Sequence, residues 1–210
     1  MSPAAATRIV FGIRVQYPVP GYRTSLVTDD FEQLLNAMKR AAAVLRDSGI
    51  PFVLAGGLAV YARGGPPTEH DVDFMLRQED AEHALAVLRE AGFREERPPE
   101  GWLYKVFEQD ASMIDLIFAP NGRPERVQAY LDRAGELEVY AITMPVMTVT
   151  DVLATKLLTL KEHELDYDSV VEIARTCREQ IEWDRLREQT AESPYAKAFF
   201  TLVEELGLAA

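Results

Sequence analysis

The sequence has few of the residues that build disulfides and thiolate metal sites. Of 210 residues, one is cysteine (Cys177), three are histidine and two are tryptophan. A single cysteine excludes an internal disulfide and any metal site built from several thiolates. Zinc-binding spacings, a Ser-His-Asp arrangement and the phosphate-loop pattern G-x-x-x-x-G-K-[ST] are also missing from the sequence. The familiar signatures of zinc enzymes, serine hydrolases and P-loop proteins are therefore absent.

Long apolar runs are missing as well. No segment approaches the roughly 20 consecutive apolar residues that cross a membrane, and residues 1–7 lack the basic-then-apolar order of a secretory signal. We therefore expect no membrane partner and a cytoplasmic location. The net charge of −12 argues against broad nonspecific binding of nucleic acid, which needs Lys and Arg to displace counterions. A local basic patch remains compatible with this charge.

The length and the residue patterns divide the chain into three regions. Residues 1–28, interrupted by Pro18, Pro20 and Gly21, form an N-terminal arm. Residues 29–149 alternate helix-like and strand-like segments, whereas residues 150–210 carry helical apolar spacing. We therefore predict an α/β fold, with a mixed sheet, flanking helices and a helical C-terminal half.

Individual segments follow from apolar spacing and turn residues. Residues 102–108 and 113–118 are predicted to form a hairpin, and Pro145 makes the extended stretch 138–149 an edge strand or an irregular one. Thr150 and Asp151 are predicted to cap the first C-terminal helix. Residues 50–54 are predicted as a buried strand, and helices are expected over or near residues 29–48, 57–63, 79–91, 126–133, 150–160, 167–180 and 194–208.

Two acidic residues stand at the entrance to an apolar strand. Asp71 and Asp73 flank Val72 and precede Phe74-Met75-Leu76. Residues two apart in a strand share one face, so the carboxylates lie side by side and repel each other unless a cation neutralises them. Oxygen ligands of this kind suit Mg²⁺, which keeps other positions for water and phosphates. The alternative is a pair of solvated acids at an exposed strand end.

A Gly-Gly pair precedes the acids. Gly56 and Gly57 follow a short apolar strand and open a helix. Glycines allow close approach of the backbone to a ligand, and free amides at a helix N-terminus suit a phosphate. Together with Asp71 and Asp73, the two glycines predict a metal–nucleotide site.

A third acid lies inside another apolar strand. Asp115 occupies Met113-Ile114-Asp115-Leu116-Ile117, where a carboxylate is unfavourable unless it is paired or bound to metal. On a neighbouring strand, Asp115 would lie against the pair and complete a site for two Mg²⁺ ions. The alternative is an acid at the sheet edge that contacts a Lys or Arg.

G-G-x-A, followed some fifteen residues later by D-x-D, resembles the minimal nucleotidyltransferases of the DNA polymerase β superfamily, and most of all the AbiEii/MenT-type toxins. The resemblance spans about residues 50 to 175. It implies Mg²⁺-dependent transfer of a nucleoside monophosphate from an NTP, with metal on Asp71, Asp73 and Asp115. It also implies that Asp115 helps to activate the acceptor hydroxyl, that Lys156 faces the triphosphate, and that the tRNA 3′ end and a cognate antitoxin are partners.

The sequence departs from that family pattern at several positions. Gly57 replaces a serine, so backbone amides would hold the phosphate. The arginine that often precedes D-x-D is missing, and Arg63 is a candidate replacement for binding nucleotide. Asp168 lacks the lysine that precedes its family counterpart, and His163 has no role in a polymerase-type mechanism.

Other acceptors and another functional class remain open. A protein side chain (AMPylation) or a small molecule such as an aminoglycoside could replace tRNA as the acceptor. Four arginines of the C-terminal helices could contact RNA, although neighbouring glutamates favour a solvated surface (Arg175, Arg178, Arg185, Arg187). A non-catalytic binding module with the same fold is the alternative from another class, and the intact acids argue against it.

Overall fold

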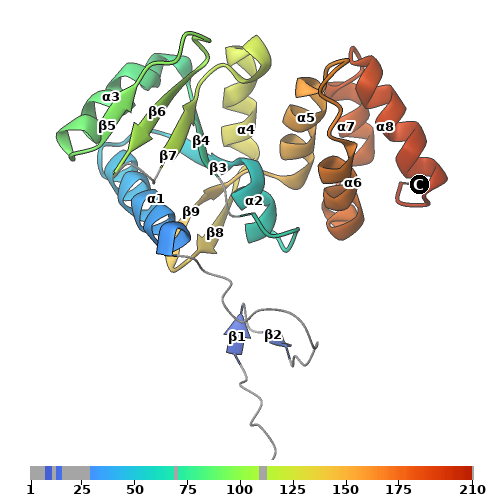
Figure 1. Cartoon of the computed structure of the whole chain (residues 1–210), viewed down its shortest axis with the longest axis horizontal. Helices are drawn as coiled ribbons and strands as arrows, with labels where there is room; N and C mark the ends of the chain where they lie inside the picture. Colours follow the sequence, from blue (N-terminus) through green and yellow to red (C-terminus); the bar gives the residue numbers. More distant parts are fainter. Residues whose placement is uncertain (1–7, 11–12, 16–28, 69–70, 109–112, 210) are drawn as a thin grey trace, which may run out of the picture.

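A mixed β-sheet organises the first two thirds of the described chain. The computed structural model describes residues 8–10, 13–15, 29–68, 71–108 and 113–209. Within these ranges, seven strands follow the order β5-β6-β7-β4-β3-β9-β8 (Figure 1). β4 pairs with β7, and β3 with β9, in parallel; the other neighbours are antiparallel. The strands are β3 (Phe52–Ala55), β4 (Val72–Leu76), β5 (Arg94–Glu96), β6 (Leu103–Phe107), β7 (Met113–Ile117), β8 (Gly135–Val139) and β9 (Ile142–Val146).

Helices flank this sheet, as the sequence predicts. The two longest of these helices, α1 and α3, pack against each other. α1 also contacts β7, α3 contacts β5 and β6, and α4 contacts β3 and β4. The short helix α2 follows β3 directly. Two further strands, β1 (Arg8–Val10) and β2 (Ile13–Val15), pair with each other. The helices of this half are α1 (Asp29–Asp47), α2 (Gly56–Ala62), α3 (Ala81–Glu90) and α4 (Val127–Arg133), with single turns η1 (Gln78–Asp80), η2 (Pro120–Gly122) and η3 (Pro124–Arg126).

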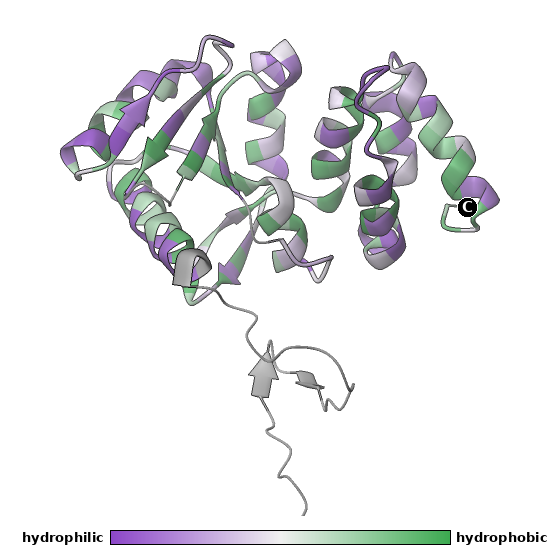
Figure 2. Cartoon of the chain, viewed as in Figure 1, coloured by the Kyte–Doolittle hydropathy of each residue, from purple (hydrophilic) through white to green (hydrophobic). Residues whose placement is uncertain are grey.

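Four helices form the C-terminal half. α5 packs against the other three and against α2, so it joins the two halves. Its Val152, Leu153 and Leu157 are fully buried, and Figure 2 shows apolar residues in β6, in β7 and along α5. The helices are α5 (Val149–Thr159), α6 (Tyr167–Thr176), α7 (Trp183–Gln189) and α8 (Pro194–Glu205), with one turn η4 (Arg178–Gln180). No helix in the described ranges is both long and apolar enough to cross a membrane.

Three local predictions were confirmed and one was wrong. α1 ends where Gly49 adopts a φ of +70°, the left-handed conformation expected after a helix. The buried strand predicted at residues 50–54 forms at 52–55, and the antiparallel pair β6–β7 also forms as predicted. Pro145, by contrast, lies in an interior strand. β9 pairs with β3 only at Leu54↔Val146, so the proline's missing N–H interrupts little of the pairing.

The chain between residues 135 and 159 also differs from the predictions. The expected single extended stretch is a hairpin, because Tyr140 and Ala141 adopt φ values of +49° and +67° and turn the chain between β8 and β9. The cap of α5 is Thr148, whose hydroxyl accepts from the Asp151 N–H at 3.1 Å. Thr150 and Asp151 lie inside the first turn and are fully buried. Helix α7 was not predicted.

Candidate active site

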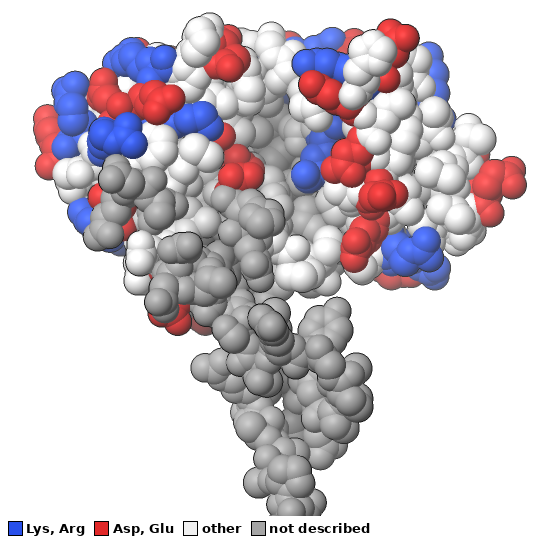
Figure 3. All heavy atoms as spheres, viewed as in Figure 1, with Lys and Arg blue, Asp and Glu red and all other residues white. Residues whose placement is uncertain are grey.

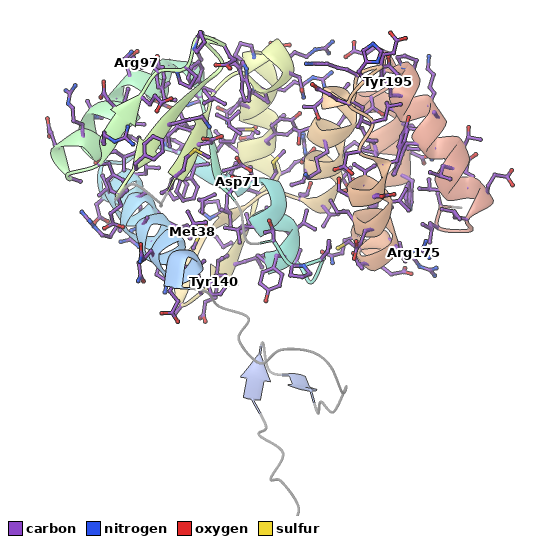
Figure 4. The ribbon with its side chains drawn as sticks, viewed as in Figure 1. Met38, Asp71, Arg97, Tyr140, Arg175 and Tyr195 are labelled. Carbon is purple, nitrogen blue, oxygen red and sulfur yellow. The ribbon has the colours of Figure 1, made fainter. Side chains whose placement is uncertain are left out.

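Two of the three predicted acids lie side by side on neighbouring strands. β4 and β7 are parallel, and Asp73 is in direct register with Asp115. Side chains in register project from the same face of a sheet whose strands are about 4.8 Å apart. Asp71 is exposed and immediately precedes β4; Figure 4 places it in the middle of the molecule, beside α2. The fold therefore brings the three predicted acids to one region.

Gly56 makes room for Asp73. A Cβ atom at Gly56 would lie 1.8 Å from Asp73 Oδ2, and the glycine has a φ of +60°. A Cβ atom at Gly57 would lie 2.8 Å from Thr68 Oγ1. Helix α2 begins at Gly56 without a side-chain cap. The glycine pair thus accommodates a carboxylate and a hydroxyl, and leaves the first amides of α2 without a side-chain acceptor.

The surroundings of Asp73 raise the pKa of its carboxyl group. Its pKa is raised to about 7, mainly by burial and also by the carboxylates of Asp115 and Asp71, against smaller opposing effects of Lys156 and Lys105. Burial also raises the pKa of Asp115, which Lys105 opposes. Carboxylates gathered in this way favour a cation nearby. This donor set suits a divalent ion that arrives with phosphate oxygens as further ligands.

Lys105 is the direct partner of Asp115. The two residues are in register on the antiparallel pair β6–β7. Lys105 Nζ donates to both carboxylate oxygens, at 2.8 Å and 3.2 Å. The sequence left open whether Asp115 would lie against the acid pair or contact a basic residue. In the structure it is in register with Asp73 and also contacts Lys105. Among the described residues, no group of three or more His, Cys, Asp or Glu side chains is arranged to hold a metal ion.

Lys156 approaches the acids from the C-terminal half. It lies on α5, is half-buried, and contributes a positive charge that lowers the pKa of Asp73. It also lowers the pKa of Asp166, for which the main cause is a hydrogen bond from Ser169. α5 packs on α2, the helix that begins at the glycine pair. That Lys156 faces a triphosphate stays a prediction.

Arg63 has another role. Its guanidinium donates from Nε to Met147 O and from Nη2 to Val146 O, both at 2.7 Å. Its own carbonyl accepts from Gln180 Nε2 at 2.8 Å. These bonds fasten the end of α2 to the end of β9, so the geometry does not support the predicted contact of Arg63 with nucleotide.

Asp168 and His163 have exposed side chains. His70, which directly precedes Asp71 in the sequence, lies outside the described residues. The arginines of the C-terminal helices are dispersed: Arg187 pairs with Glu204, Arg178 with Glu179, and Arg185 with Glu182. Figure 3 likewise shows basic and acidic side chains interspersed over the visible surface.

Sequence reasoning assigned no site role to Lys105 or Thr68 and missed the network around Asp151. The signal for Lys105 is a lysine within the apolar run Leu103-Tyr104-Lys105-Val106-Phe107, where an unpaired charge is unfavourable. Asp151 is fully buried and bound by Arg133 through two bonds of 2.9 Å and 2.8 Å. No local pattern links residues 18 positions apart, so only the fold reveals this pair.

Two solved structures have a fold similar to that of this chain. The chain resembles the solution structure of the antibiotic-resistance factor ANT(2″)-Ia with a TM-score of 0.56 and 14% identity, over 85% of this chain and 98% of that one. The crystal structure of ANT(2″)-Ia in complex with adenylyl-2″-tobramycin gives a TM-score of 0.56 and 13% identity, over 81% and 98% of the two chains. A comparison with curated proteins found no match.

A family model described as "Uncharacterised nucleotidyltransferase" matches residues 22–204. This range includes all the candidate residues and both halves of the described fold. The chain therefore belongs to this nucleotidyltransferase family and is a transferase enzyme.

Proposed function

We propose that this enzyme transfers a nucleoside monophosphate from an NTP to a hydroxyl group of a small molecule, in a Mg²⁺-dependent reaction. The observation that carries the proposal is the register of Asp73 with Asp115, next to a glycine that accommodates the Asp73 carboxylate. Asp71 and Asp73 would hold Mg²⁺, which supplies positive charge to the triphosphate oxygens when bound. Participation of Asp115 in a second ion site remains a prediction.

The chain's own residues divide the remaining tasks. The first amides of α2, at Gly56 and Gly57, bind phosphate oxygens, and Lys156 neutralises charge that develops on the pyrophosphate. The acceptor oxygen bonds to the α-phosphorus as the bond between that phosphorus and the bridging oxygen breaks. Pyrophosphate leaves, and Asp115 orients the acceptor hydroxyl and accepts its proton.

The charge distribution favours a small acceptor over RNA. The net charge of −12 opposes a polyanion, and Arg178, Arg185 and Arg187 are paired with acids. The similar fold of ANT(2″)-Ia, which has been solved with adenylyl-2″-tobramycin, covers both halves of this chain. The tRNA 3′ end, with a cognate antitoxin as partner, is the alternative suggested by the toxin-like pattern of the sequence.

The experiment is transfer from each α-labelled NTP with Mg²⁺ and a cell extract separated into small-molecule, RNA and protein fractions. The Asp71→Ala/Asp73→Ala variant is the control. Label in the small-molecule fraction, absent with the control variant, is the expected result. Label in RNA would instead establish transfer to RNA, as in the tRNA alternative, and label in protein would establish transfer to a protein side chain.

A further inference from the structure

Lys105 forms an ion pair with Asp115 that has no part in the proposed reaction. Its ammonium contacts both carboxylate oxygens, at 2.8 Å and 3.2 Å. The exposed fractions of the two side chains are 24% and 16%, so water screens this ion pair less than it screens pairs at the surface. Nζ also lies 3.5 Å from Met113 Sδ. The lysine is thus fixed on the carboxylate by its strand and by its neighbours.

The neighbouring strands determine this contact. Lys105, Asp115 and Asp73 stand in one row across β6, β7 and β4, so their side chains share one face. Val106 and Ile114, on the opposite face, are fully buried and hold β6 and β7 in this register. A slip of β6 by one residue would turn Lys105 into that apolar layer. Lys105 and Asp115 therefore meet because of the fold.

The same row explains why the third acid is not part of a ready-made metal site. Asp115 has Lys105 on one side and Asp73 on the other, and it accepts from Lys105 with both oxygens. Within the described ranges, no three acids, histidines or cysteines are arranged to hold a metal ion. A metal ion that uses Asp115 must compete with the ammonium for the same oxygens.

We propose that Lys105 is a positioning residue whose ammonium group stays paired with Asp115 in the nucleotide-free enzyme. There it competes with a divalent metal ion for this carboxylate, until the nucleotide brings its own phosphate ligands to the metal. This proposal rests on the proposed function. Asp71 and Asp73 then remain available for the metal that accompanies the NTP, while Lys105 keeps Asp115 oriented and weakens the binding of free metal without substrate. Lys105 therefore lowers the affinity of the nucleotide-free enzyme for metal.

The test is binding of Mn²⁺ to the nucleotide-free protein, measured by the EPR signal of free Mn²⁺. Lys105→Gln and Lys105→Met both remove the positive charge, and Lys105→Met also keeps the apolar stem of the side chain. One folded variant of the two is sufficient for the test. Both are expected to bind Mn²⁺ about fivefold or more tightly than wild type, the effect of an ion pair of moderate strength. Lys105→Arg, which keeps a positive charge at this position, is expected to bind Mn²⁺ with the affinity of wild type.

Arg94 provides the matched control. It lies on β5, next to β6, where its guanidinium stands 4.1 Å from the ring centre of Phe107. Arg94→Met removes the same charge from the adjacent strand and is expected to leave the Mn²⁺ affinity unchanged within about twofold. In an Asp115→Asn background the effect of Lys105→Gln should vanish, because the carboxylate for which lysine and metal compete is gone.

The outcomes separate this proposal from the function on which it rests. If wild type binds Mn²⁺ and Asp73→Asn abolishes binding, the metal site stands. Equal affinities of wild type, Lys105→Gln and Lys105→Met would then overturn the role of Lys105 alone, as would an equal increase in Arg94→Met. Absence of Mn²⁺ binding by wild type, both with and without NTP, would overturn the proposed metal chemistry and this inference together.

Discussion

Asp73 shows how a residue suited to catalysis can be unfavourable for the metal-free fold. Its pKa rises from the ordinary value of 3.8 to about 7 because of burial and of the neighbouring acids. The folded protein consequently binds the proton more tightly than the unfolded chain does, and ionisation destabilises it. This penalty is absent below pH 3.8, grows between 3.8 and 7, and is complete above about 7.

The first prediction concerns Asp73→Asn in metal-free buffer. Above pH 7 the variant should be more stable than wild type, because the amide carries no charge, by about 2–4 °C in Tm for each kcal/mol of penalty removed. The difference should shrink as the pH falls towards 4, and NMP transfer should be lost at every pH. Thermal unfolding at a series of pH values checks this; a variant less stable than wild type at pH 8 would contradict it.

A second residue-scale prediction concerns Gly56. In Gly56→Ala, the new methyl would lie 1.8 Å from Asp73 Oδ2 at a φ of +60°, so the carboxylate must move. We expect transfer to fall about 100-fold or more, in line with a displaced catalytic group. Gly49→Ala is the matched control, since Gly49 has a φ of +70° and open space around it. Gly49→Ala should lose about 1 kcal/mol of stability and keep its activity; equal activity losses in both variants would refute the role of Gly56.

At the scale of elements, the sequence predicted the acids better than it predicted their neighbours. Asp115 stood out as a charge within an apolar strand, but its pairing with Asp73 depends on the parallel contact of β4 and β7. About 40 residues separate these strands along the chain, so local periodicity cannot give their register. For the same reason Pro145 was assigned to an edge strand or an irregular one, whereas β9 has a neighbouring strand on each side, β3 and β8.

The network around Asp151 provides the third prediction. Asp151 is fully buried at the start of α5, and it receives hydrogen bonds from Arg133, Thr148 and Gln189. Asp151→Ala leaves Arg133 without its partner and should lower the unfolding free energy by about 2–4 kcal/mol. Glu179→Ala, which breaks the exposed pair with Arg178, should change it by less than about 1 kcal/mol. Urea unfolding of both variants measures the difference; equal small changes would contradict a stabilising network.

At the scale of the whole molecule, the proposed site draws on both halves of the chain. The division near residue 149 coincides with the end of the sheet and the start of α5, yet α5 packs on α2 as well as on the C-terminal helices. Composition and helical spacing are the basis of this division, which stays a prediction. They could not show that α5 brings Lys156 close to Asp73, because that proximity arises from tertiary packing.

The fourth prediction tests this contribution of the C-terminal half. Lys156→Met removes the charge that α5 brings to the acids and should lower NMP transfer about 100-fold or more. Its Tm should stay close to that of wild type, because the apolar stem of the side chain is kept. Lys161→Met is the control, since Lys161 is exposed and pairs only loosely with Glu164 at 3.9 Å. Similar transfer by both variants would show that Lys156 lies outside the site.

The central claim is that Asp71 and Asp73 form a metal–nucleotide site, and equilibrium binding of NTP with and without Mg²⁺ tests it most directly. Wild type should bind at least one NTP more tightly when Mg²⁺ is present, and Asp71→Asn/Asp73→Asn should lose about 100-fold or more of that affinity. Binding by the folded double variant that equals wild type in Mg²⁺ would contradict the claim.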